Sequence, residues 1–231
     1  MNLDKATEDE SRKEGYAQYA KFMACITAHY LDSKAEYDPM SIFLSSKIDL
    51  VPYQIYDFSR LIAEERRSGG IRALIAYETG LGKTILVGML IRELLSRATS
   101  PPLVPRVRRV LIVTPPTVLP QFRDEMARKF GLDFEEPAQG PPFLGDMSIA
   151  SMDTLKMAEW MERLTEQEWD LVVVDEYHRV NDQNMRGGLV SLLTKKTKHF
   201  IALTATPHDG KQERYNFRLK TIAPNPLIVC V

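Results

Sequence analysis

The chain has 231 residues, 44% of them hydrophobic and 26% charged, and a formal net charge of −1 at pH 7. These values are typical of a globular protein with one sizeable core. No apolar run approaches the roughly 18 residues that cross a bilayer, and the acidic, polar N-terminus is unlike a signal peptide. We therefore expect a cytoplasmic protein with no membrane partner.

Charge is spread unevenly along the chain. Residues 60–130 carry 13 Lys and Arg against 6 Asp and Glu, residues 131–185 carry 3 against 13, and residues 186–231 carry 8 against 2. Local basic surface can meet a phosphate backbone, although solvated helix faces explain any single charge equally well. Cys25 and Cys230 have no neighbouring Cys or His cluster, so we expect two packing residues rather than a zinc site or a disulfide.

The first 35 residues predict an amphipathic helix, because their apolar residues recur at spacings of three and four. We expect residues 1–44 to form a helical extension and residues 45–231 to form one domain. Within that domain, a second helix begins at Pro52, follows a helical apolar period and ends at Gly69-Gly70.

The stretch AYETGLGKT, Ala76 to Thr84, follows the apolar run IRALI and opens into a helical run. A polyphosphate needs backbone N–H donors, little side-chain bulk and a cation, and Gly80, Gly82 and Lys83 supply these. Thr84 offers a hydroxyl to Mg²⁺. We interpret the stretch as a phosphate-binding loop, although Tyr77 stands where the common pattern starts with Gly. A glycine-rich helix start with a solvated lysine is the alternative.

The next elements alternate between helix and strand. A helix over Lys83–Arg97 precedes a buried strand in RRVLIVTPP, and strand, helix and strand form one right-handed crossover. VLPQFRDEMARKF predicts a helix, MSIAS a strand, Thr154–Leu164 a helix, and LIVCV a last short strand.

The stretch EWDLVVVDEYH predicts a buried strand, Leu171–Val174, that delivers Asp175 and Glu176 at its carboxyl end. Ligands of open parallel sheets collect at that edge. An aspartate there can hold Mg²⁺ together with Thr84, and the next carboxylate can polarise the attacking water. Together with GLGKT, the pair predicts nucleotide hydrolysis. An acidic strand end that caps a helix is the alternative, and it leaves GLGKT unexplained.

A further strand, Phe200–Leu203, ends in Thr204, Ala205 and Thr206. The hydroxyls of Thr204 and Thr206 can reach the acidic pair at the same edge and so connect the nucleotide state to another ligand. A Thr-Pro turn without function is the alternative.

Five stretches in order carry a family resemblance. GLGKT, TPPTVLPQFRDE, SMDTL, VVVDEYH and LTATPHDGK resemble motifs I, Ia, Ib, II and III of superfamily 2 helicases and translocases. The sequence is most similar to the chromatin-remodeller-type branch, with its bacterial RNA-polymerase-associated ATPases and phage-defence-island helicases, and KIDLVPYQ resembles the segment before motif I. The resemblance implies one RecA-like P-loop domain of the α/β class, with a mostly parallel central sheet and helices on both faces.

The resemblance also implies roles for single residues. The implied ATP-binding residues are Gln54 on the adenine and, around the phosphates, Thr79, Gly80, Leu81, Gly82, Lys83 and Thr84. The implied catalytic residues are Lys83, Asp175 and Glu176, with Thr84 and Asp175 on Mg²⁺, and Thr204, Ala205 and Thr206 would couple ATP to nucleic acid. Backbone contacts to nucleic acid, without base readout, are implied for Thr114, Pro115, Pro116, Thr117, Ser151 and Thr154.

Three positions depart from the branch: Tyr77 replaces Asp, Thr79 replaces a hydrophobic residue, and Tyr177 replaces Ala. None removes a group that the chemistry requires. The arginine finger of such motors lies on a second RecA-like lobe, which we expect in cis or in trans, so the chain alone should bind ATP weakly and hydrolyse it very slowly. Duplex DNA is the expected partner. An RNA helicase lobe and a non-motor module that senses ATP or nucleic acid are the alternatives.

Overall fold

The computed structural model describes residues 51–96, 107–137, 144–181, 184–208 and 210–230. The expected extension at residues 1–44 and the position of Cys25 lie outside the described residues, as does Arg97 at the expected end of a helix. Within the described part, no helix is both long enough and apolar enough to cross a membrane.

Six parallel strands form one sheet in the order β3-β2-β4-β5-β1-β6. They are β1 (Arg72–Ala76), β2 (Val110–Thr114), β3 (Met147–Ser151), β4 (Trp169–Val174), β5 (Thr197–Thr204) and β6 (Leu227–Cys230). The expected parallel α/β sheet is confirmed. Cys230 ends the edge strand β6 and is exposed, so the expectation that it packs in the core is wrong.

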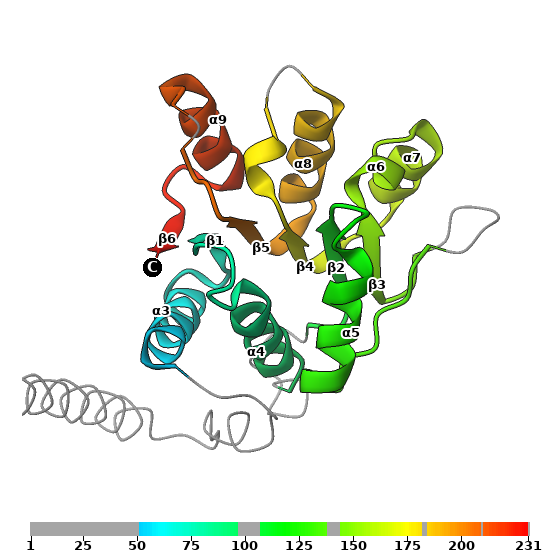
Figure 1. Ribbon diagram of the computed structural model, residues 1–231. Coiled ribbons are helices and arrows are strands. Elements are labelled where there is room, and N and C mark those ends of the chain that lie inside the picture. The colour runs from blue at the N-terminus through cyan, green and yellow to red at the C-terminus, as the bar shows by residue number, and fades with distance from the viewer. Residues whose placement is uncertain (1–50, 97–106, 138–143, 182–183, 209, 231) are drawn as a thin grey trace, which may run out of the picture.

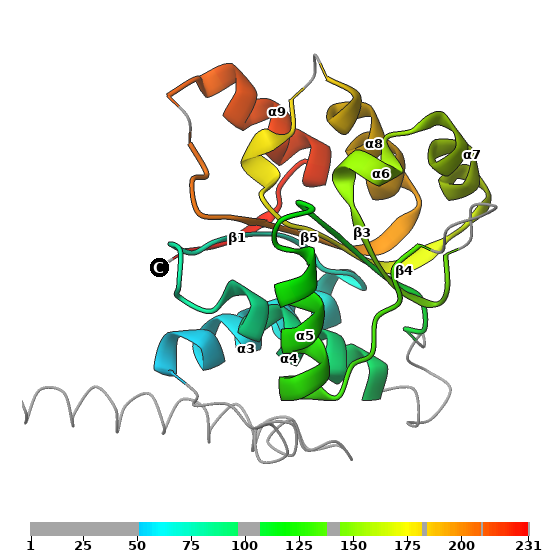
Figure 2. The same ribbon diagram turned by 45° about the vertical axis from the view of Figure 1, so that its right-hand side comes forward.

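Helices cover both faces of the sheet (Figures 1 and 2). One face carries α3 (Pro52–Ser68), α4 (Lys83–Ser96) and α5 (Leu119–Phe130), and the other carries α6 (Met152–Leu155), α7 (Ala158–Glu166), α8 (Met185–Lys195) and α9 (Gln212–Ile222). Alternate residues of each strand enter opposite cores. Ala73 and Ile75 belong to the first core, whereas Leu74 and Ala76 belong to the second.

The single helix expected over Thr154–Leu164 is wrong, because α6 and α7 are separate. The Ser151 hydroxyl accepts the Thr154 N–H and starts α6 at Met152. Met157 is extended, with φ −69° and ψ 145°, and lets the chain turn before α7. Each short helix then buries its own apolar pair.

Helices α8 and α9 were not predicted from the sequence. Gly187 and Gly188 lower the helix propensity at the start of α8, yet Asn184 caps that helix by accepting the Gly187 N–H at 2.9 Å. An Asn cap was therefore the available signal. Helix α9 is polar and buries only Arg218 and Ile222, so its apolar period is weak.

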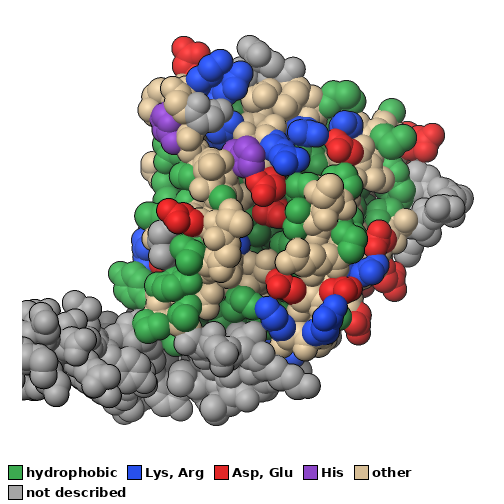
Figure 3. Space-filling model, in the orientation of Figure 1, with side chains coloured by type: hydrophobic (Ala, Val, Ile, Leu, Met, Phe, Trp, Pro, Cys, Tyr) green, Lys and Arg blue, Asp and Glu red, His purple; other side chains and the backbone are tan. Residues whose placement is uncertain are grey.

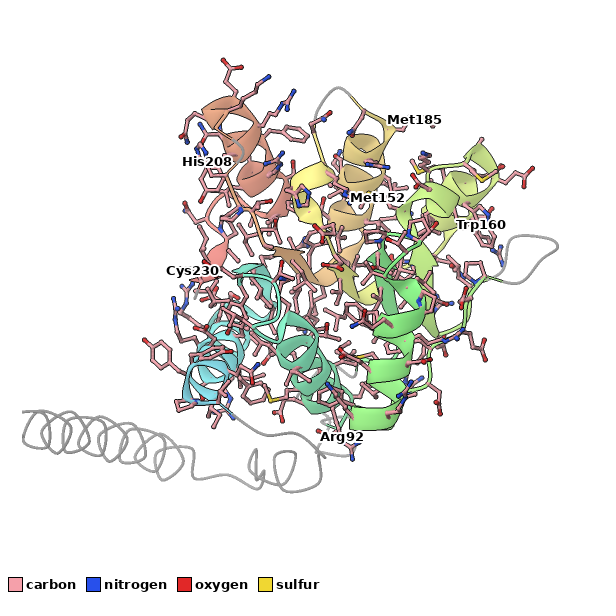
Figure 4. All side chains as sticks on the ribbon, in the orientation of Figure 1. Arg92, Met152, Trp160, Met185, His208 and Cys230 are labelled. Atoms are coloured by element: carbon pink, nitrogen blue, oxygen red, sulfur yellow. The ribbon has the colours of Figure 1, made fainter. Side chains whose placement is uncertain are left out.

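Gly88 permits the close approach of α4 and α5. A Cβ atom at Gly88 would lie 2.2 Å from Cε2 of Phe130. Arg92, labelled in Figure 4, also links α4 to the end of α5, because its guanidinium donates to the Phe130 carbonyl. The first core therefore has no room for a larger residue at position 88.

We predict that Gly88→Ala lowers the free energy of unfolding by about 1 to 3 kcal/mol, because overpacking forces a ring or a helix to move. Gly188→Ala is the matched control, since nothing lies within 4 Å of its Cβ, and it should stabilise α8 by up to about 1 kcal/mol. Urea denaturation measures both. Equal effects of the two substitutions would contradict the close packing at Gly88.

Candidate functional site

The strand register brings the predicted residues to one edge of the sheet. Ala76 of β1 pairs with Thr204 of β5, and Val174 of β4 pairs with Ala202 of β5 and Val113 of β2. The loop after β1, the two carboxylates after β4 and the threonines after β5 therefore meet at the carboxyl ends of neighbouring strands. Figure 3 shows acidic side chains in the middle of the viewed face of the molecule, with basic and histidine side chains beside them.

The loop between β1 and α4 has the backbone of a phosphate cradle. Gly80 and Gly82 adopt φ values of +88° and +77°, a region that favours glycine. Thr79 is exposed, whereas Leu81 and Thr84 are half-buried. The Lys83 ammonium donates to the carbonyls of Tyr77 at 3.0 Å and Glu78 at 3.2 Å, and so lies over the loop. The N-terminus of α4 follows directly and suits an anion.

Helix α3 contacts this loop through two polar side chains. Tyr53 donates to the Leu81 carbonyl at 3.0 Å, and the Gln54 amide donates to the carbonyls of Leu81 at 3.2 Å and Gly82 at 3.4 Å. Gln54 is only 4% exposed, and its buried Oε1 accepts no hydrogen bond from the described residues. The Gln54 amide therefore donates to the loop, while its oxygen is available to accept a hydrogen bond.

Tyr77 adds a third link between α3 and the loop. Its hydroxyl donates to Asp57 Oδ2 at 2.6 Å, and its ring packs edge-on against Tyr53 with the centroids 5.6 Å apart. Burial raises the pKa of the Tyr77 hydroxyl, and the hydrogen bond to Asp57 acts in the same direction. Tyr53 and Asp57 were not among the residues predicted from the sequence, although their spacing of four places them on the same helix face as each other.

Asp175 is buried at the end of β4. Its Oδ1 accepts the Glu176 N–H at 2.8 Å, and its Oδ2 accepts the Thr114 hydroxyl at 3.4 Å. Burial raises the pKa of Asp175, while the Lys83 ammonium acts in the opposite direction. The lysine and the carboxylate are therefore within electrostatic reach of one another across the edge.

Glu176 is the one non-glycine residue in the described part with a positive φ, 50°, a conformation that is uncommon outside glycine. Its Oε2 lies 3.0 Å from His178 Nδ1, and the same nitrogen lies 3.4 Å from Thr204 Oγ1. Thr204 also accepts the Thr206 N–H at 3.1 Å. His178, which the sequence analysis gave no role, thus connects the acidic pair to the end of β5.

The short 3₁₀ turn η2 (Tyr177–Arg179) carries His178 and is held by α9. Arg218 donates to the carbonyls of Val180 at 3.0 Å and His178 at 2.5 Å, and the Tyr177 hydroxyl donates to the Arg218 carbonyl at 3.2 Å. Burial raises the pKa of Tyr177. Tyr177, which departs from the branch pattern, is therefore a buried residue whose hydrogen bond links η2 to α9.

The residues expected to contact nucleic acid divide by exposure. Pro116 and Thr117 are exposed after β2, whereas Thr114 is buried against Asp175 and Pro115 is buried beside it. Beyond β3, the Ser151 hydroxyl caps α6 and lies 2.8 Å from the half-buried Thr154 hydroxyl. At the β5 end, Ala205 is half-buried and Thr206 exposed.

A shallow hollow lies between these segments and the acidic pair. Met152, labelled in Figure 4, is part of its wall. The residues that line it come from the segments that follow β2, β3 and β4, including α6 and η2, and from the start of α8: Pro115, Pro116, Met152, Asp153, Asp175, Glu176, Arg179 and Arg186.

A RecA-like α/β sheet whose carboxyl edge carries the GLGKT loop, the DE pair and the TAT segment defines the class of superfamily 2 helicase-type P-loop proteins. Residues 47–209 match the family described as "Type III restriction enzyme, res subunit". The chain belongs to this family.

Curated relatives agree with this class. The chain is 33% identical over 227 residues to the RNA polymerase-associated protein RapA of Vibrio vulnificus (strain CMCP6), covering 90% of this chain and 22% of the relative. It is 34% identical over 203 residues to RapA of Vibrio campbellii, covering 81% of this chain and 20% of the relative. The chain thus spans about a fifth of the length of these relatives.

The fold is similar to that of the helicase domain of Hef from Pyrococcus furiosus. The TM-score is 0.60 at 19% sequence identity, covering 77% of this chain and 37% of the Hef chain. This likeness supports the RecA-like fold alone.

We predict that Asp175→Asn raises the free energy of unfolding by about 1 kcal/mol without Mg²⁺ and nucleotide, because it removes a buried charge and keeps the side-chain shape. Asp170→Asn is the control on the same strand. Its carboxylate accepts the N–H groups of Arg108 at 2.7 Å and Arg109 at 2.9 Å, so this change should lower stability by about 1 kcal/mol. Thermal unfolding in EDTA measures both, and a loss of stability in both variants would contradict a buried Asp175 charge that costs stability.

Proposed function

We propose that residues 45–231 form the ATP-binding lobe of a cytoplasmic translocase that hydrolyses ATP while moving along DNA. The main support is the meeting of Lys83, Asp175 and Glu176 at one sheet edge, beside a loop that Gln54 contacts from α3. The family and the RapA relatives support a helicase-type ATPase.

The residues present fit ATP with Mg²⁺. Gly80 and Gly82 open the loop backbone, and the Lys83 ammonium can leave the carbonyls of Tyr77 and Glu78 for phosphate oxygens. The Thr84 hydroxyl and the Asp175 carboxylate are oxygen ligands of the kind that Mg²⁺ prefers. The bound nucleotide would supply the phosphoanhydride, and the metal ion would neutralise the charge of its phosphates.

Glu176 is the group that would orient and polarise the attacking water. In this structure its carboxylate pairs with His178 instead. Because His178 Nδ1 also faces Thr204, a change at Thr204–Thr206 can alter how Glu176 is held. This route would couple hydrolysis to nucleic acid.

The free acceptor of Gln54 suits adenine, whose exocyclic amino group donates a hydrogen bond, and does not suit the carbonyl at the same position of guanine. We predict that Gln54→Ala weakens ATP binding about 10-fold and leaves GTP binding nearly unchanged. Ser59→Ala is the control, because the Ser59 hydroxyl bonds within α3 to the Ile55 carbonyl. Titration with fluorescent nucleotides measures the preference, and an equal loss for ATP and GTP would contradict adenine recognition by Gln54.

The class and the relatives support a nucleic-acid partner. Duplex DNA, contacted through its backbone near Pro116, Thr117 and Thr154, is the partner we propose, together with a second RecA-like lobe in cis or in trans. A helicase lobe that acts on RNA, and a non-motor module that senses ATP or nucleic acid, are the alternatives. RapA is named for its association with RNA polymerase, and polymerase is a further partner to test.

The function is tested by turnover with and without a second lobe. We predict that the 231-residue chain turns ATP over very slowly, because an arginine finger contributes about 10³ to 10⁵ in rate. Fast steady-state turnover that Lys83→Ala abolishes would contradict this. In a two-lobed protein, Glu176→Gln should keep ATP binding and lose turnover that duplex DNA stimulates. If neither DNA nor RNA stimulates turnover, the translocase hypothesis is wrong.

A further inference from the structure

Three cations gather around the hollow, and two of them come from a region of the chain that is otherwise acidic. Residues 131–185 contain 3 Lys and Arg against 13 Asp and Glu. Yet Arg179 lines the hollow, Lys156 lies beside it through its ion pair with Asp153, and Arg186 joins them from the start of α8. We call Lys156, Arg179 and Arg186 the basic rim.

One acidic residue pairs with two members of the basic rim. Asp153 pairs with Lys156 at 2.8 Å and with Arg186 at 3.0 Å, and hydrogen bonds from Lys156 and then Arg186 lower its pKa. One carboxylate therefore faces two cations. Asp175 and Glu176 also line the hollow, but among the described residues no ion pair joins either of them to the basic rim.

Arg179 is the most available member of the basic rim. It is exposed, and within the described ranges its guanidinium has no hydrogen bond or ion pair. A guanidinium presents a planar fork of donors that matches phosphate oxygens. The arginine can therefore take a phosphate without giving up an existing contact.

We propose that the basic rim binds phosphodiester groups of the nucleic-acid backbone, with Arg179 and Arg186 as the donors. The proposal rests on the proposed function, and it adds the charge that the expected contacts lack. Neither Pro116 nor Thr117 is charged, whereas backbone affinity comes chiefly from cations that neutralise phosphates. The contact carries no sequence information.

The position of Arg179 gives this contact a route to the ATP site. Arg179 lies at the end of the turn η2, and its N–H donates to the Glu176 carbonyl at 3.0 Å. Arg218 holds the His178 and Val180 carbonyls from α9. A phosphodiester bound to Arg179 would therefore contact the end of a short turn that begins at Glu176 and that Arg218 holds from α9.

The test measures binding of the 231-residue chain to a fluorescein-labelled DNA duplex by anisotropy over a series of KCl concentrations. We expect Arg179→Ala and Arg186→Ala each to make the slope of log K against log salt less steep by about 1. Arg186→Lys keeps the charge and should keep the slope. Arg128→Ala is the matched control, because Arg128 pairs with Asp124 at 2.9 Å on α5, on the other face of the sheet (Figure 1), and it should leave the slope unchanged.

The outcomes separate the basic rim from the proposed function. If the chain binds the duplex and both alanine variants behave like Arg128→Ala, the basic rim is wrong and the proposed function stands. If the chain binds no DNA or RNA at any salt concentration, both fail. If the variants lose binding to a labelled poly-glutamate peptide but not to the duplex, the partner is an acidic protein segment and the proposal is overturned. Arg179→Ala removes an exposed side chain, so an unchanged thermal unfolding curve verifies its fold.

Discussion

The register of β4 between β2 and β5 is the constraint on which the candidate site depends. A parallel strand that is apolar on both faces has no alternation of its own to fix its register. Polar groups at its two ends do so here. Asp170 accepts the N–H groups of Arg108 and Arg109 at one end, and Asp175 accepts the Thr114 hydroxyl at the other. A slip by one residue would break both sets of hydrogen bonds and move the acidic pair away from the phosphate loop.

The same edge contains a competition for one nitrogen. His178 Nδ1 faces both the Glu176 carboxylate and the Thr204 hydroxyl, and a ring nitrogen carries at most one proton to donate. A hydrogen bond to one partner therefore weakens the other. Glu176 is also held in a left-handed backbone conformation, so its backbone and its carboxylate are both constrained at this edge.

The sequence predicted the features that local signals encode. Continuous apolar runs predicted the strands, and the glycines and lysine of the loop predicted its place before α4. The missing features depend on contacts between distant segments. The hydrogen bond from Tyr77 to Asp57 joins residues 20 positions apart, and the hydrogen bonds from Arg218 to η2 and Val180 join residues about 40 positions apart. No local sequence pattern predicts such contacts. The break between α6 and α7 was missed because it depends on the extended backbone of Met157, which the apolar helical period does not encode.

The two tyrosines that depart from the branch pattern have a common physical consequence. Tyr77 ties the phosphate loop to Asp57 of α3 on one face of the sheet, and Tyr177 ties the turn after β4 to α9 on the other. Both rings are almost fully buried, so each hydroxyl needs its partner to avoid an unpaired buried donor. The loop and the turn are thereby fixed from opposite helical layers, independently of each other. The carboxyl edge of the sheet is thus held from both helical layers, while Arg179 at the end of η2 stays exposed.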